Sequence, residues 1–267
     1  MLEKLLQFQN YLIRNGRSIG TAKAYVFQVK KLLTACPKLT QETVDDYLTK
    51  YAERSEGSYM NSAINSLRAY FTYAELNITL PKWAKVTHKK IESLPMDFVE
   101  KKILPAVEYM NFQNPYKTKS ILYLMAYTGM RKSEVPLLTR ENIDLDKRRL
   151  KVYLKKVGKE KIFKFPKKVA VEIKEYFSTE LEETNAFNIG ERGVDCIFRK
   201  LKQHFKGDVN LFPHLFKKIA ITHLHNVCEF SLKEISVMVG ISVQTIEKHY
   251  LDIDMDKIEE IYDERIK

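Results

Sequence analysis

A basic stretch without hydrophobic periodicity divides this chain into two parts that have different patterns. The stretch, residues 85–94, follows Pro81 and is rich in lysine, which is typical of a linker. We therefore predict a first domain at residues 1–84, a second at residues 95–250 and a separate tail at residues 251–267. A chain of 267 residues is long enough for two such domains.

Residues 1–84 have apolar side chains at helical spacing and no strand pattern. One helix is expected on each side of Gly16, and Pro37 ends the second helix. Thr40 is placed to cap a third helix, and residues 58–76 form a fourth. The first domain is therefore predicted to be entirely helical.

Residues 95–250 are mixed. Residues 149–154 and 161–165 alternate apolar and basic side chains on both sides of a turn that contains Gly158, which indicates a β-hairpin. The other segments are helical: 96–109, 117–128, 169–181, 193–205, 217–228, 232–239 and 243–249. The predicted fold class is mainly α with a small antiparallel β-hairpin or sheet.

The charge balance favours a polyanionic partner. The net charge is +11, yet the tail carries seven acidic residues against three basic ones, so the rest of the chain carries +15. A nucleic acid is the polyanion that we expect residues 1–250 to face. A generally basic surface is the alternative that charge alone leaves open.

The cysteines and the apolar runs exclude several classes of protein. Cys36, Cys196 and Cys228 form no Cys-x-x-Cys pair, so neither a disulfide framework nor a zinc site is indicated. No run approaches the roughly 20 apolar residues of a membrane span, and residues 1–4 lack a signal-peptide core. We expect a cytoplasmic protein without membrane contact.

Arg131 and Glu134 are the first candidate functional residues. They lie in the segment Thr-Gly-Met-Arg-Lys-Ser-Glu, residues 128–134, directly after an apolar helix. A guanidinium held there can bind two phosphate oxygens, and Glu134 can orient it. A surface arginine with an i,i+3 partner is the plainer interpretation of these two residues alone.

This segment resembles the Thr-Gly-x-Arg-x-Ser-Glu box of tyrosine recombinases and integrases of the phage-integrase type. The resemblance covers residues 95–260, and the helical first domain is similar to the family's core-binding domain. The composition is similar to archaeal mobile-element and Xer-like integrases. The resemblance implies a two-domain architecture, with a helical core-binding domain and a mixed α+β catalytic domain.

The resemblance also implies the roles of the site residues. Tyr250 would be the nucleophile that forms a 3′-phosphotyrosine, Arg131, His214 and Lys217 would hold the phosphate charge, and Lys156 would protonate the leaving 5′-oxygen. Supporting residues would be Glu134, Ile241 and His249, and the DNA contacts would be Lys155, Lys159, Lys161 and Lys218. No metal or other cofactor is implied.

Two positions depart from the family pattern. Lys217 stands where the family has a second arginine, so the charge is kept but the planar fork is lost. Ile241 stands where the family has His or Trp, and its side chain cannot donate a hydrogen bond. A recombinase-fold protein that binds DNA but has lost cleavage is therefore one alternative.

A helix-turn-helix transcription regulator is the other alternative. In residues 232–250, Gly240 would occupy the turn and Ser242 would cap a recognition helix. This interpretation leaves the arginine box, the basic hairpin and the His-x-x-Lys segment at His214 unexplained. We therefore rank it below the recombinase.

The tail has an amphipathic pattern and resembles the family's trans-docking C-terminal helix. Docking in trans would assemble a synaptic tetramer on two DNA sites, whereas docking in cis would not, and both remain open at this point. Accessory DNA-bending proteins, the target sequence and the choice among integration, excision and dimer resolution also remain open.

Overall fold

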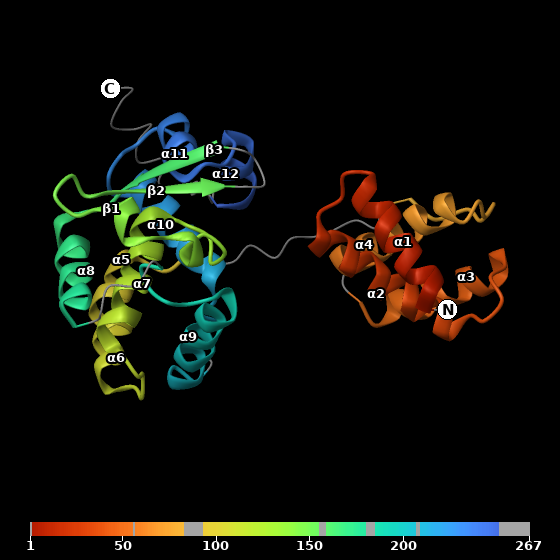
Figure 1. Cartoon of the computed structure of the whole chain (residues 1–267), viewed down its shortest axis with the longest axis horizontal. Helices are drawn as coiled ribbons and strands as arrows, with labels where there is room; N and C mark the ends of the chain where they lie inside the picture. Colours follow the sequence, from red (N-terminus) through yellow and green to blue (C-terminus); the bar gives the residue numbers. More distant parts are fainter. Residues whose placement is uncertain are drawn as a thin grey trace, which may run out of the picture. The chain divides into compact units, whose positions relative to one another are not determined.

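The computed structural model describes residues 2–55, 57–82, 93–154, 159–179, 185–206 and 209–250 (Figure 1). The chain divides into two compact units, Met1–Lys89 and Lys90–Lys267. Each has its own apolar core, and they are described separately. Among the described residues, no helix combines the length and the apolar character that crossing a membrane requires.

Unit 1 is helical. Its helices are α1 (Leu2–Arg14), α2 (Ile19–Ala35), α3 (Gln41–Glu53) and α4 (Gly57–Tyr73). Ser18 and Thr40 cap α2 and α3 by accepting backbone N–H groups with their side chains. The core includes Phe8, Val29, Leu32, Val44, Ile64, Leu67 and Phe71, which confirms the helical periodicity expected of this part.

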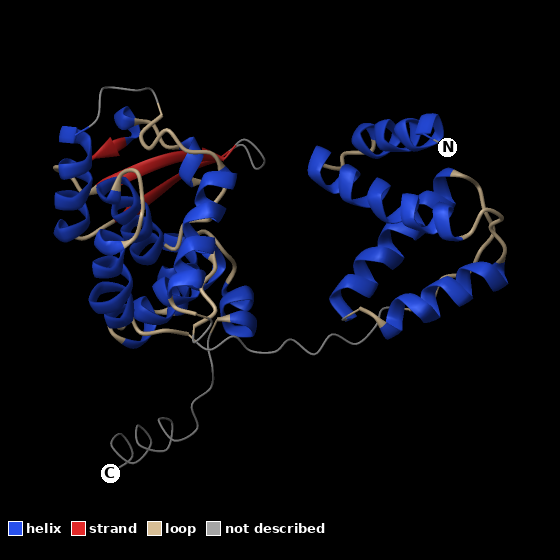
Figure 2. Cartoon of the chain, turned by 90° about the horizontal axis from the view of Figure 1, so that it is seen from below, coloured by secondary structure: helices blue, strands red, loops and turns tan. Residues whose placement is uncertain are grey.

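Unit 2 combines helices with a small sheet (Figure 2), and its apolar core is larger than that of unit 1. The helices are α5 (Met96–Phe98), α6 (Leu104–Tyr109), α7 (Pro115–Thr128), α8 (Lys167–Thr179), α9 (Glu191–His204), α10 (Pro213–Asn226), α11 (Leu232–Val239) and α12 (Val243–His249). The π-helix η1 (Val99–Ile103) joins α5 to α6, and the 3-10 turns η2 (Val135–Leu137) and η3 (Arg140–Asn142) follow α7. The predicted bounds of α11 and α12 are confirmed, whereas α10 begins four residues earlier than predicted and so includes His214.

The sheet has three antiparallel strands in the order β1-β2-β3. These are β1 (Ile143–Asp144), β2 (Arg149–Leu154) and β3 (Lys159–Lys164). The predicted hairpin is confirmed, with Leu150 opposite Phe163 and Val152 opposite Lys161. The two-residue strand β1 is too short to leave a periodic pattern and was not predicted.

Glycine in the left-handed region ends both α7 and α11. Gly129 has φ +62° and Gly240 has φ +65°, and each donates its backbone N–H to a carbonyl of its helix. A Cβ on Gly129 would lie 3.1 Å from Val239 Cγ1, so the two helix ends are closely packed. A side chain at Gly129 is therefore strained by the backbone conformation and crowds Val239.

The substitution Gly129→Ala is expected to lower the free energy of unfolding of unit 2 by about 1–3 kcal/mol. The cause is the strain of an L side chain at φ +62° together with the contact to Val239. Urea denaturation of the full chain measures the change. Gly20→Ala in α2 is the matched control, because Gly20 is helical and open and alanine there should stabilise unit 1. Equal stability of the Gly129→Ala and wild-type proteins would contradict the argument.

Candidate active site

Arg131 is held by a buried carboxylate three residues away. The turn at Gly129 ends α7, and Glu134 then accepts the backbone N–H of Arg131 at 2.8 Å and its Nη1 at 3.0 Å. The Arg131 side chain is 43% exposed, while that of Glu134 is 3% exposed. Glu134 therefore fixes one edge of the guanidinium, and the rest of the group reaches solvent.

His214 and Lys217 lie one turn apart at the start of α10. His214 is partly exposed, whereas Lys217 is only 1% exposed. Lys217 Nζ donates to the carbonyl oxygen of Gly129 at 3.0 Å and to that of Val239 at 3.4 Å. Its ammonium thus contacts the C-terminal ends of α7 and α11, where helix dipoles favour positive charge.

Burial, together with the nearby cations Arg131 and Lys161, lowers the pKa of Lys217 to about 7, while Glu134 acts in the opposite direction. The unfolded chain therefore binds more protons at this lysine between about pH 7 and its ordinary pKa of 10.5. The contribution of Lys217 to stability is fully present above that window and is lost as the pH falls through about 7.

The free energy of unfolding is therefore expected to rise with pH above about 7, by at most about 1.4 kcal/mol per pH unit from this group. Lys217→Met should flatten that rise, leaving the smaller part that Lys161 contributes. Urea denaturation at pH 7 and pH 9.5 measures it. Lys174→Met, an exposed substitution on α8, should keep the wild-type slope. An unchanged slope in Lys217→Met would show that the lysine is not perturbed.

Tyr250 ends α12 and points into the molecule. Its side chain packs in a small apolar cluster with Ile221, Ile235, Val239 and Ile246, and the residue is 5% exposed. The Tyr250 hydroxyl and His214 Nε2 share a hydrogen bond of 2.7 Å. The structure therefore brings together two candidate residues that are 36 positions apart in the chain.

The electrostatics around this pair keep the proton on tyrosine in the free protein. Partial burial lowers the pKa of His214, and interactions with Lys217, Arg131 and His249 lower it further, so neutral imidazole is favoured near pH 7. Burial raises the pKa of Tyr250, while Arg131 acts in the opposite direction. A neutral Nε2 can accept the phenolic proton, and Arg131 can stabilise the resulting negative charge.

The supporting residues lie around the turn between α11 and α12 and at the end of α12. Ile241 packs against the cluster that holds Tyr250, and its carbonyl accepts the Ser236 hydroxyl at 2.6 Å. Its side chain therefore packs and supplies no hydrogen bond. His249 is exposed at the end of α12, directly before Tyr250.

Some of the lysines predicted to contact DNA lie outside the described residues, and two others are buried. Lys155 and Lys156 lie outside the described residues, as does the side chain of Lys159. Lys218 is buried on α10, and Lys161 is buried on β3, where its Nζ lies 3.4 Å from a Glu134 oxygen. The sequence signal that could have placed Lys161 inward was the alternation of β3, which puts Lys161 on the same face as Phe163. The apolar Ile162 between them made that alternation hard to recognise.

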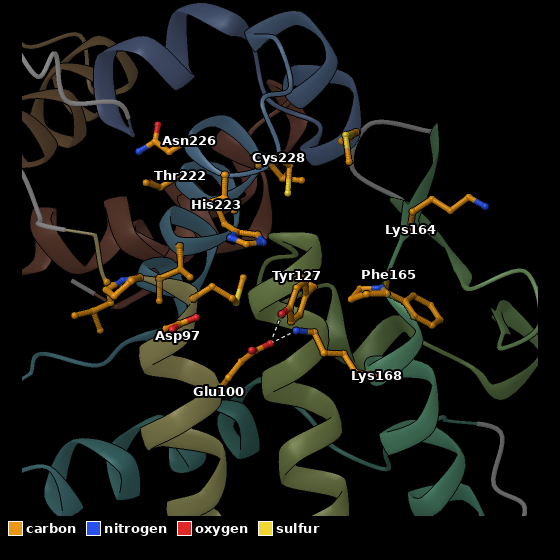
Figure 3. A pocket seen from close by; sticks show the side chains of 18 of the residues that line it. Asp97, Glu100, Tyr127, Lys164, Phe165, Lys168, Thr222, His223, Asn226 and Cys228 are labelled. Atoms are coloured by element: carbon orange, nitrogen blue, oxygen red, sulfur yellow. Dashed lines mark hydrogen bonds and ion pairs between the residues drawn. The ribbon is translucent and has the colours of Figure 1, made fainter. Parts of the chain in front are cut away.

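A separate cavity of about 870 Å³ lies elsewhere in unit 2 (Figure 3). Glu100 accepts hydrogen bonds from the Tyr127 hydroxyl and from Lys168, and His223 lines the same space. Neither Arg131 nor Tyr250 lines it. The candidate active site is therefore the group of residues around Arg131 and Tyr250, because the hydrogen-bonded phenol and imidazole lie there. No sequence pattern had indicated the Glu100 network.

The described residues contain no group of three or more His, Cys, Asp or Glu side chains placed to hold a metal ion. The side chains at the site are instead a phenol, an imidazole, a guanidinium, two lysines and one carboxylate.

Comparison with known proteins agrees with this fold. The sequence profile of the phage integrase family matches residues 96–257, which is more than half of the chain. The chain therefore belongs to the phage integrase family, and the resemblance drawn from the arginine box is confirmed.

Two curated relatives and one solved structure extend the match. A tyrosine recombinase of Thermosipho africanus is 27% identical and covers 84% of this chain and 86% of its own length. Tyrosine recombinase XerA of Pyrococcus furiosus is 25% identical, and the match covers 83% of this chain and 80% of that protein. A lambda integrase dimer bound to a core site superposes with a TM-score of 0.71 at 16% identity, covering 95% and 96%. The last match concerns the fold, and it confirms the predicted architecture.

Proposed function

We propose that this chain is a site-specific DNA recombinase that cleaves and rejoins strands through a 3′-phosphotyrosine at Tyr250. The observation that carries the proposal is the 2.7 Å hydrogen bond between the Tyr250 hydroxyl and His214, beside the Arg131–Glu134 pair. The relatives named tyrosine recombinases support the reaction class. The helix-turn-helix alternative finds no support, because Tyr250 faces inward to His214.

The proposed reaction exchanges one phosphate ester for another. Tyr250 attacks the scissile phosphorus in line while His214 accepts its proton, and the bond from phosphorus to the 5′-oxygen breaks. Arg131 stabilises the charge on the non-bridging oxygens, and the buried ammonium of Lys217 adds positive potential. Lys156 protonates the leaving oxygen, and a free 5′-hydroxyl then reverses the steps on the partner strand.

The partner is duplex DNA that carries a specific site. The lambda integrase structure contains a core site, and the body of the present chain carries the positive charge that phosphates require. We propose that residues 1–84 act as a core-binding domain, that residues 85–94 link it to the catalytic domain, and that four copies form the synaptic complex. The acidic tail at residues 251–267 lies outside the described residues, and its docking in trans is part of this proposal, as is a cytoplasmic location.

The test begins by selecting bound duplexes from a random pool. The recovered duplex is then nicked near its centre, so that cleavage releases a short strand and traps the covalent intermediate. Denaturing electrophoresis and peptide mapping should find DNA attached to Tyr250. Selection of a specific site without any adduct would overturn the catalytic proposal.

Binding to a specific site without an adduct would indicate the remaining candidate, a DNA-binding protein that has lost cleavage. One observation favours it: Lys217 Nζ donates to two backbone carbonyls within the protein, and Lys217 is almost completely buried. Arg131 remains partly exposed, so one phosphate-binding cation is still available. The adduct experiment separates the two functions directly.

A further inference from the structure

Lys161 points inward from its strand, although the neighbouring Ile162 points outward. On β3, Phe163 is buried on the same face as Lys161, while Ile162 between them is 49% exposed. Lys161 is 8% exposed and stands opposite the buried Val152. Burying an ammonium here while exposing an isoleucine is unfavourable, so the position calls for a reason other than core packing.

The Lys161 side chain lies between two parts of the site. Its Nζ is 3.4 Å and 3.5 Å from the two oxygens of Glu134 and 4.0 Å from the centre of the Phe163 ring. A Cβ on Gly240 would lie 2.8 Å from Lys161 Cε, so the stem passes directly against the turn that leads to α12. Lys161 therefore contacts both the partner of Arg131 and the approach to Tyr250.

The charges in this cluster explain why a second cation is needed. Glu134 binds both the backbone N–H and the guanidinium of Arg131, so it sets the direction of Arg131. The same carboxylate also opposes the positive charge that Arg131 must offer to a phosphate. A cation at Lys161 offsets Glu134 from its other side, and burial increases the strength of that interaction.

We propose that Lys161 is a positioning residue that lets Glu134 orient Arg131 without neutralising it. This role rests on the proposed recombinase function and replaces the direct DNA contact that the hairpin pattern predicts for Lys161. The lowered pKa of Lys161, about 8 because burial outweighs the carboxylate, agrees with a lysine enclosed in the protein.

The experiment measures adduct formation on the selected nicked duplex with five variants, one of which is Glu134→Gln alone. Lys161→Met should slow the reaction by about tenfold or more, the range expected for loss of an interaction with a charged group. Lys161→Arg should retain most of the rate, because the charge is kept. Glu134→Gln combined with Lys161→Met should react faster than Lys161→Met alone, since no carboxylate then needs to be offset. Lys174→Met, exposed on α8, should react like the wild type.

A direct phosphate contact by Lys161 predicts that the losses from Lys161→Met and Glu134→Gln multiply, and that result would overturn the proposal. An unchanged rate in Lys161→Met would overturn it as well. A readout on the free protein separates this proposal from the recombinase function. The Nε–Hε resonance of Arg131, assigned with Arg131→Lys, should move in Lys161→Met and stay near its wild-type position in Lys161→Arg. A resonance that does not move in Lys161→Met would reject the role even if the wild type forms no adduct.

Discussion

Replacing Tyr250 with phenylalanine is expected to abolish the covalent protein–DNA adduct while leaving DNA binding nearly unchanged. The hydroxyl is the attacking atom, and removing a nucleophile from an active site lowers the rate by about 10⁴-fold or more. The ring, which packs in the apolar cluster, is retained, so stability should change by only about 1 kcal/mol. Adduct yield on the nicked duplex measures the first effect, and fluorescence anisotropy measures binding.

The matched control is Tyr109→Phe, which removes an exposed hydroxyl from the same unit and should cleave like the wild type. An adduct that persists in Tyr250→Phe would assign the nucleophile to another residue. Loss of binding together with cleavage would instead indicate that the His214 contact supports the DNA surface. Both outcomes can be distinguished on one set of proteins.

The second large effect is expected at Arg131. Arg131→Ala should reduce adduct formation by about 10²- to 10⁴-fold, because it removes a preorganised donor from the charge that develops on the phosphate. Lys217 cannot replace it, since its Nζ already donates to Gly129 and Val239. Arg131 should therefore tolerate substitution less than an arginine in a site that has two.

Arg131→Lys should recover only a small part of the rate, because one ammonium cannot both pair with Glu134 and present two donors to a phosphate. Rates are measured under single-turnover conditions on the nicked duplex, with Arg192→Ala on α9 as an exposed control of the same charge change. A near-complete rate in Arg131→Lys would contradict the forked contact. It would show instead that a point charge is sufficient at this position.

Local structure was largely predictable. The capped segments after Ser231 and Ser242 became α11 and α12 with the predicted bounds, because serine caps and the Gly240 turn are short-range signals. The hairpin was predictable for the same reason, since alternation and a glycine turn are local. The start of α10 was misplaced because Pro213 at the first helical position was not taken as its beginning.

The sequence offered the candidate site residues but not their arrangement. The order of Arg131, His214 and Tyr250 along the chain indicated the chemistry, and the family comparison confirmed the class of protein. Lys161 was predicted to contact DNA, yet it lies under Glu134. A lysine on a basic hairpin is ordinarily solvated, so composition alone could not indicate its burial.

The sequence by itself determined the helices, the hairpin and the family, because these depend on residues that are neighbours in the chain or recur in a known order. Only the tertiary structure decided which groups meet. It joined the ends of α7 and α11 through Lys217 and brought Tyr250 to His214. The physical reason is that these contacts depend on how buried helix ends and one inward strand face pack together, and charges enclosed there interact with partners that are distant in sequence.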